Sequence, residues 1–261
     1  MSDPAPLDGY STAVRRETER VLDACPGMHG ELLRYQHGLE QEEVAGGKAP
    51  SSLVAPALCL LTADALGGRR EQALAAGSAV AFLQSYVFIE TDIATQCAER
   101  NGRPTLWRRW GVPLALNAAD GMVSQAHQAL ARLAEGIGLA RALAAAHLLD
   151  DACLRLCESE FAYYASAGGP GSSNADHLRV AQARERALLA LAASLGALAG
   201  GVEEKALGAF ADFGNQLGVE RGLGRDGVRA AVRALDVAAV PEDARPRLAE
   251  AAAYIGERGV K

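Results

Sequence analysis

Residues 79–122 read AVAFLQSYVFIETDIATQCAERNGRPTLWRRWGVPLALNAADGM. In the first part of this stretch, apolar side chains recur three and four residues apart, at Leu83, Tyr86, Val87, Ile89 and Ile93. This spacing places them on one face of a helix. Alanine, leucine, glutamate and arginine dominate the rest of the chain, and alternating runs of β-branched residues are almost absent. The composition therefore favours helix in nearly every window, and we expect an all-α protein of about ten helices.

The 261 residues are expected to form one domain, over residues 1–261. Glycine pairs and prolines separate the helical segments, but no linker is rich enough to divide the chain. Residues 187–199 are apolar almost all round, which predicts a helix inside the bundle. We expect residues 1–10 to be disordered and residues 166–174 (SAGGPGSSN) to form a mobile loop between two long helices.

The overall charge and composition exclude several classes of protein. The net charge of −6 offers no basic surface for nucleic acid or an anionic membrane. The longest apolar stretch is too short to span a bilayer, and the N-terminus shows no export leader. Five cysteines, an odd number scattered through the chain, are typical of a reducing compartment. We therefore expect a cytoplasmic protein with neither a nucleic-acid nor a membrane partner.

A series of short motifs follows the first helix of the quoted stretch. In order along the chain these are Gly102-Arg103-Pro104-Thr105, Trp107, Trp110-Gly111 and Asn117-Ala118-Ala119-Asp120. Their order and spacing resemble the trans-isoprenyl diphosphate synthase (polyprenyl synthetase) family, and weaker echoes extend over most of the chain. The resemblance implies a single helical bundle of the isoprenoid-synthase type around a central cavity.

The chain departs from this family at the two aspartate-rich motifs that hold magnesium on the substrate diphosphate. Residues 91–95 read TDIAT and residues 225–229 read RDGVR, so each motif keeps one carboxylate, Asp92 and Asp226. Because Mg²⁺ prefers several hard oxygen ligands, these remnants are not expected to hold the three-magnesium cluster. We assign no residue as a metal ligand, and Mg²⁺ is a cofactor with only weak support.

Polar side chains near the expected mouth of the bundle are the candidate site residues. Asp92, Glu90 and Glu160 are candidates for general acid or base. The resemblance and the surviving charges nominate a second group for binding substrate or an anion, namely Gln84, Thr91, Thr95, Arg100, Arg103, Arg184, Arg225 and Asp226. A cavity that keeps both signs of charge suits a polar or anionic guest. The alternative is that these residues form internal salt bridges or face water at helix ends.

Three functions are compatible with these features. The first is a divergent biosynthetic enzyme, a cyclase or lyase acting on a polar or anionic small molecule without the usual metal cluster, and not a conventional chain-elongating synthase. The second is a catalytically silent subunit of a heteromer with an active partner enzyme. The third is a prenyltransferase or terpene cyclase with reduced dependence on metal. Apolar helix faces beyond those needed for the core predict a dimer, either homomeric or heteromeric.

Overall fold

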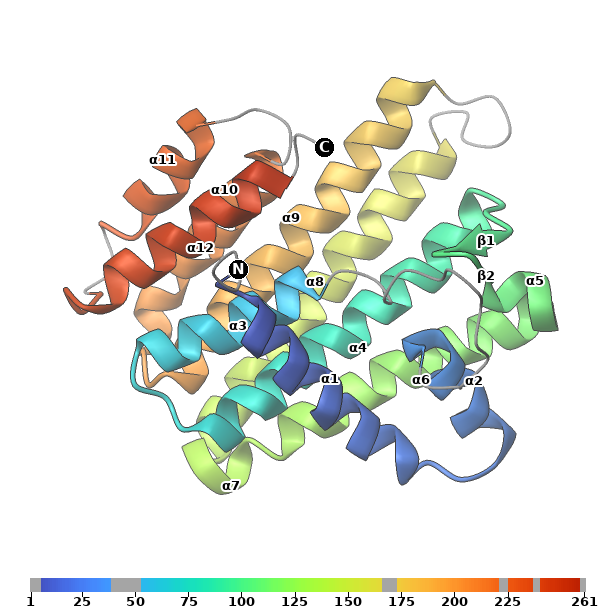
Figure 1. Cartoon of the computed structure of the whole chain (residues 1–261), viewed down its shortest axis with the longest axis horizontal. Helices are drawn as coiled ribbons and strands as arrows, with labels where there is room; N and C mark the ends of the chain where they lie inside the picture. The colour runs from blue at the N-terminus through green and yellow to red at the C-terminus, as the bar shows by residue number, and fades with distance from the viewer. Residues whose placement is uncertain (1–5, 39–52, 166–172, 221–224, 237–239, 259–261) are drawn as a thin grey trace, which may run out of the picture.

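The structure is a computed structural model that describes residues 6–38, 53–165, 173–220, 225–236 and 240–258. Nearly all of these residues are helical (Figure 1), so the expected all-α bundle is confirmed. The helices are α1 (Asp8–Asp23), α2 (Gly27–His37), α3 (Val54–Ala65), α4 (Arg70–Ala94), α5 (Leu106–Trp110), α6 (Val112–Ala131), α7 (Ala134–Ile137), α8 (Leu139–Ala165), α9 (Asn174–Ala199), the 3₁₀ turn η1 (Glu204–Ala206), α10 (Leu207–Glu220), α11 (Arg225–Ala234) and α12 (Ala244–Arg258). Strands β1 (Glu99–Arg100) and β2 (Arg103–Pro104) form a small antiparallel hairpin.

Helix α4 runs through the middle of the bundle and packs against α1, α3, α6 and α9 (Figure 1). It is long and apolar enough to cross a membrane, but 83% of its most apolar stretch is buried among other helices. Phe82 and Leu83, near its centre, are fully buried. Burial of such side chains stabilises the fold by about 1.5–3 kcal/mol each. Helix α4 is therefore the core helix of the bundle.

Helix α9 is the second buried helix and lies beside α3, α8 and α10 (Figure 1). Every residue from 187 to 199 is buried, as the all-round apolar pattern predicts. Arg141 of α8 donates hydrogen bonds to the carbonyl oxygens of Leu198 (2.6 Å) and Val202 (2.8 Å) at the end of α9. These bonds tie α8 to the C-terminal end of α9 and to the turn that follows it.

Glycines allow α10 to approach α9 closely. A Cβ atom at Gly214 would overlap the carbonyl oxygen of Leu189, and one at Gly218 would lie 2.6 Å from the Cα atom of Arg186. Any larger side chain at these two positions would force the helices apart. The α9–α10 contact therefore depends on small residues and holds α10 against the buried core.

Two expected irregular segments fall partly outside the described residues. Of residues 1–10, positions 1–5 are not described, whereas helix α1 begins at Asp8 and Leu7 is buried. Of residues 166–174, positions 166–172 lie outside the described residues and helix α9 begins at Asn174.

Replacing Gly214 tests the closeness of the α9–α10 contact. We expect Gly214→Ala to lower the free energy of unfolding by about 2 kcal/mol, because the new methyl group meets backbone atoms that cannot rotate away. The matched control is Gly208→Ala in the same helix, where nothing lies within 4 Å of an added Cβ. Its free energy of unfolding should stay constant or rise by up to about 1 kcal/mol. Urea unfolding of both variants makes the comparison, and equal losses would contradict a close contact.

Candidate functional site

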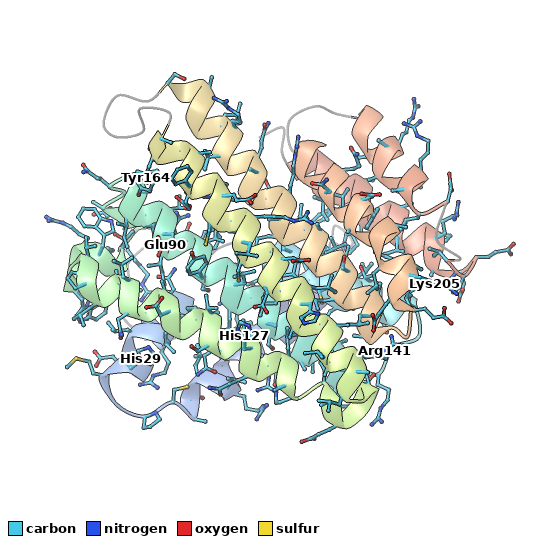
Figure 2. All side chains as sticks on the ribbon, turned by 180° about the vertical axis from the view of Figure 1, so that it is seen from behind. His29, Glu90, His127, Arg141, Tyr164 and Lys205 are labelled. Atoms are coloured by element: carbon cyan, nitrogen blue, oxygen red, sulfur yellow. The ribbon has the colours of Figure 1, made fainter. Side chains whose placement is uncertain are left out.

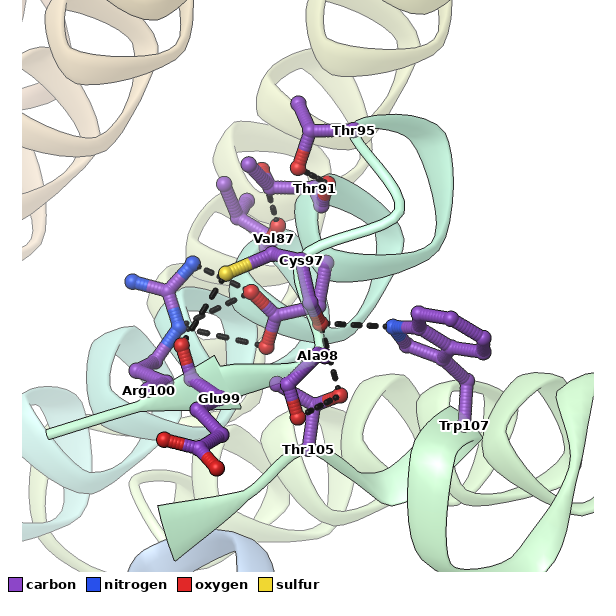
Figure 3. Close-up of polar contacts among 10 residues, drawn as sticks. Val87, Thr91, Thr95, Cys97, Ala98, Glu99, Arg100, Thr105 and Trp107 are labelled. Carbon is purple, nitrogen blue, oxygen red and sulfur yellow. Dashed lines mark hydrogen bonds and ion pairs between the residues drawn. The ribbon is translucent and has the colours of Figure 1, made fainter. Parts of the chain in front are cut away.

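The connector that follows α4 turns back toward that helix. Asn101 and Gly102 both have positive φ angles, 54° and 77°, between strands β1 and β2. Two successive residues in this conformation form the tight turn typical of Asn-Gly hairpins. This turn pairs β2 with β1, whereas the reversal that brings Arg100 back to α4 comes earlier, at Gln96, whose φ angle is also positive (53°). There the Cys97 N–H donates to the carbonyl oxygen of Asp92, and Arg100 lies beside the last turns of α4 (Figure 3).

Thr105 and Trp107 of the connector support its backbone. The Thr105 hydroxyl and the Trp107 ring N–H both donate to the carbonyl oxygen of Cys97, each at 2.8 Å (Figure 3). The guanidinium of Arg103 stacks on the Tyr35 ring, 4.2 Å from its centre, and the Tyr35 hydroxyl donates to the carbonyl of Pro104. These contacts hold the hairpin against α2. Arg103 was expected to bind substrate; among the described residues its buried Nη2 has no acceptor, and it lies outside the lining of the cavity described below.

Asp92 and Arg100 form a buried ion pair at the C-terminal end of α4. Asp92 is only 3% exposed. Nε of Arg100 donates to both carboxylate oxygens, at 3.0 and 3.1 Å, and Nη2 donates to Oδ1 at 2.5 Å. Burial raises the pKa of Asp92 above its ordinary value, although the Arg100 hydrogen bonds and charge lower it in part. The carboxylate is therefore committed to Arg100 and orients that guanidinium.

A cavity of about 370 Å³ lies between α3, α4, α9 and the hairpin. Its apolar walls come from Val54, Ala55, Val87, Phe88, Ala181, Leu188 and Leu189. Its polar lining consists of Gln84, Thr91, Arg100, Asn101, Arg184 and Glu185. The volume is within the range of small-molecule sites, and the lining combines apolar walls with charged and polar side chains.

Arg184 of α9 also lines this cavity. It is 8% exposed and forms an ion pair with Glu160 of α8 through Nη2. Its Nε is buried and donates no hydrogen bond. A buried donor without an acceptor is costly and indicates capacity for a ligand. Glu160 therefore holds Arg184 in position while part of the guanidinium stays available.

Glu90 lies outside the lining of the cavity. Burial raises the pKa of its carboxyl, the charges of Glu160 and Asp120 raise it further, and Arg184 lowers it. The same surroundings raise the pKa of Tyr164, mainly through burial (Figure 2). Glu90 therefore belongs to a polar cluster that also involves α6 and α8.

The structure thus brings together only some of the candidate residues. Those that line the cavity are Gln84, Thr91, Arg100 and Arg184. Asp92 and Glu160 lie behind the two arginines and pair with them, as the salt-bridge alternative predicts. The Thr91 and Thr95 hydroxyls donate to backbone carbonyls of Val87 and Thr91, and Thr95 does not line the cavity. Arg225 and Asp226 begin helix α11, but their side chains lie outside the described residues.

The cavity residues that escaped nomination are mostly apolar. Phe88, Leu188 and Leu189 form its walls, and in the sequence they are indistinguishable from core side chains. Asn101 and Glu185 add polar atoms. Their positions next to Arg100 and Arg184 are the signal that could have identified them.

The carboxylates near the cavity do not fit a magnesium cluster. Both oxygens of Asp92 accept hydrogen bonds from Arg100. Within the described ranges, no three Asp, Glu, His or Cys side chains converge as a metal site would require.

Comparisons with known proteins place these features in a family. The sequence model of the polyprenyl synthetase family matches residues 42–220. A short chain isoprenyl diphosphate synthase of Methanothermobacter thermautotrophicus is 28% identical over 207 residues, which are 79% of this chain and 60% of that protein. A geranylgeranyl diphosphate synthase of Mycobacterium tuberculosis is 31% identical over 163 residues, which are 62% of this chain and 46% of that protein. The chain thus spans about half to three fifths of the length of these relatives.

Solved structures support the fold. The polyprenyl synthetase from Streptomyces coelicolor A3(2) superimposes with a TM-score of 0.80 and 17% identity, over 96% of this chain and 98% of that chain. A geranylgeranyl pyrophosphate synthetase from the archaeon Geoglobus acetivorans gives a TM-score of 0.77 and 18% identity, over 97% and 99% of the two chains. The expected isoprenoid-synthase bundle is confirmed.

The comparisons also correct the expected function. The relatives are named as geranylgeranyl, farnesyl or short-chain prenyl diphosphate synthases, which are chain-elongating enzymes. The prediction of a cyclase or lyase, the silent-subunit alternative, and the prediction that the chain is not a conventional chain-elongating synthase are therefore wrong. Of the third alternative, the names agree with the prenyltransferase and not with the terpene cyclase. The error was to take the loss of metal-binding carboxylates as evidence against chain elongation, although a cavity with apolar walls and two arginines is kept.

Separating Arg100 from Asp92 tests the buried pair. Arg100→Gln leaves a buried carboxylate without its cation and should lower the free energy of unfolding by about 3 kcal/mol at pH 7. Losing Arg100 also raises the pKa of Asp92 further, because Arg100 lowers it in the unmodified chain. Above this pKa the buried carboxyl is charged and destabilises the fold, whereas below it the carboxyl is neutral. The deficit should therefore shrink as the pH is lowered.

Urea unfolding at several pH values measures this effect. The control is the double variant Asp92→Asn with Arg100→Gln, which carries no buried charge and should recover much of the loss at pH 7. A loss in Arg100→Gln that is the same at every pH would contradict the assignment.

Proposed function

The chain belongs to the polyprenyl synthetase family, and we propose that it is a chain-elongating prenyltransferase, which joins two prenyl diphosphates and releases pyrophosphate. The names of its relatives support this reaction class and a short-chain product. Because the chain spans only part of the curated relatives, the activity is proposed for the cavity that the structure describes.

The observation that carries the proposal is the match between the cavity and an amphipathic anion. A prenyl diphosphate has an apolar chain attached to a strongly anionic head. The cavity has apolar walls that include Phe88, Leu188 and Leu189, and guanidinium groups from Arg100 and Arg184 line it as well. Hydrophobic burial would stabilise the chain, and charge-assisted hydrogen bonds would stabilise the head.

Each arginine has a definite part in the proposed reaction. When the bond between the prenyl carbon and its diphosphate oxygen breaks, negative charge grows on the departing pyrophosphate. N–H donors that already point at this charge lower the barrier without reorganisation. Asp92 holds Arg100 and Glu160 holds Arg184, so both carboxylates are positioning residues. The apolar walls limit the access of water to the reacting carbon. The described carboxylates do not fit a metal cluster, so no step is assigned to magnesium.

The proposal includes a cytoplasmic location and a homodimer. All five cysteines are free thiols, as a reducing compartment favours.

The homodimer is proposed from an exposed apolar stripe on helix α8. The helix exposes Leu139, Leu143, Leu154 and Phe161, and at about 100° per residue these side chains fall within one narrow sector of the helix. An exposed apolar stripe of this kind marks a surface for association, and a second copy presents the same stripe.

Replacing Arg184 tests the reaction. Arg184→Gln removes an oriented cation and should lower kcat/KM at least about 100-fold. The assay follows product formation from an allylic diphosphate and labelled isopentenyl diphosphate. Arg108→Gln, which removes an exposed arginine of α5 away from the cavity, is the matched control and should keep full activity. No turnover by the unmodified chain with any allylic diphosphate would overturn the proposed function.

Charge on the α8 stripe tests the dimer. Phe161→Glu should convert a dimer into monomers, because the 76%-exposed ring would be buried between copies and a carboxylate there would remain unpaired. The control is Ala162→Glu, since the neighbouring residue is exposed on a different side of α8. Sedimentation equilibrium compares their masses. If the unmodified chain is monomeric at micromolar concentration, the proposed homodimer is refuted.

A further inference from the structure

A second cavity, of about 280 Å³, lies on the other side of α9, between α8 and α10. The three helices are neighbours in sequence and in space (Figures 1 and 2). The polar side chains that line the cavity are Arg155, Arg179, Gln182, Arg186 and Asn215. No carboxylate is among the described lining residues. This composition is unusual in a chain whose net charge is −6.

The spacing along α9 explains why these side chains converge. Positions 179, 182 and 186 are three and four residues apart, so they share one face of the helix. Arg184 comes two positions before Arg186 and projects from a different side of the helix. It lines the first cavity, between α3, α4, α9 and the hairpin, which is called the prenyl cavity here after the function proposed for it. Arg155 comes from α8 and Asn215 from α10. The two cavities therefore use separate arginines of the same helix.

Arg179 interacts within the chain, but the other four polar side chains of this second cavity have no partner among the described residues. The side chains of Arg155, Gln182, Arg186 and Asn215 form no hydrogen bond or ion pair with another described residue. Nε of Arg186 is buried and donates to no acceptor. The backbone of Arg186 is fixed by its close contact with Gly218. Buried donors are normally satisfied, so an acceptor from outside the chain would complete this arrangement.

We propose that this cavity is a binding site for a compact phosphate-class anion, separate from the prenyl cavity. Planar guanidinium groups bind phosphoryl oxygens through paired N–H donors, and the amides of Gln182 and Asn215 add further donors. Cations are excluded by the lack of carboxylates. A prenyl chain is excluded because the apolar lining is limited to Ala183 and Ala187. The inference does not depend on the proposed function.

Calorimetric titration with inorganic pyrophosphate tests the site on the full chain at constant ionic strength. The titration is performed with the Arg184→Gln variant, because this replacement weakens the binding of pyrophosphate in the prenyl cavity and leaves the second site unchanged. Adding Arg155→Gln should weaken the remaining binding at least about tenfold, because a charge-assisted contact is lost. Arg155 is exposed, so its replacement is not expected to disturb folding. A parallel titration with inorganic phosphate distinguishes a monophosphate from a diphosphate site.

The matched control is Arg16→Gln, which removes an exposed arginine of α1 and should leave the affinity unchanged. Equal affinity with and without Arg155→Gln, or no binding in the Arg184→Gln background, would overturn the second site without affecting the proposed function. Conversely, binding that depends on Arg155 in a chain without prenyl transfer would uphold the second site and overturn only the proposed function.

Discussion

A carboxylate buried at the end of an apolar helix is the constraint on which the site depends. Asp92 is almost without solvent contact, and an unpaired charge there would cost several kcal/mol. The chain satisfies this requirement by reversing at Gln96, whose φ is positive, so that Arg100 lies beside α4 and pairs with Asp92. Thr105 and Trp107 then hold the connector by donating to one carbonyl oxygen. The connector motif and the cavity arginine are consequently parts of a single arrangement.

Helix α9 has a comparable role on the other side of the cavity. Its all-round burial allows it to form a wall of the prenyl cavity while also contacting α8 and α10. Arg184 faces the prenyl cavity and pairs with Glu160, whereas Arg186 faces the second cavity and is unpaired among the described residues. A change in the α9–α10 contact at Gly214 or Gly218 would therefore reach both cavities through one rigid helix.

The sequence was sufficient for the fold but only partly for the site. Helical periodicity and the motif from Gly102 to Trp107 predict the bundle, because both signals are local. The pairing of Glu160 with Arg184 spans 24 residues and depends on how α8 lies against α9, which no local pattern specifies. Asp92 and Arg100 were nominated for separate roles for the same reason. Counting carboxylates in the motif also favoured the wrong reaction class, because it ignored the apolar walls.

The two cavities differ in how their arginines act. In the prenyl cavity each arginine already has a carboxylate partner, so the net charge is small and the guanidinium groups contribute mainly direction. Direction suits a reaction whose charge appears at one oxygen during bond cleavage. The described lining of the second cavity holds no carboxylate, so its attraction is a net-charge effect that salt screens strongly. One cavity is therefore suited to stabilising a transition state, and the other to retaining an anion.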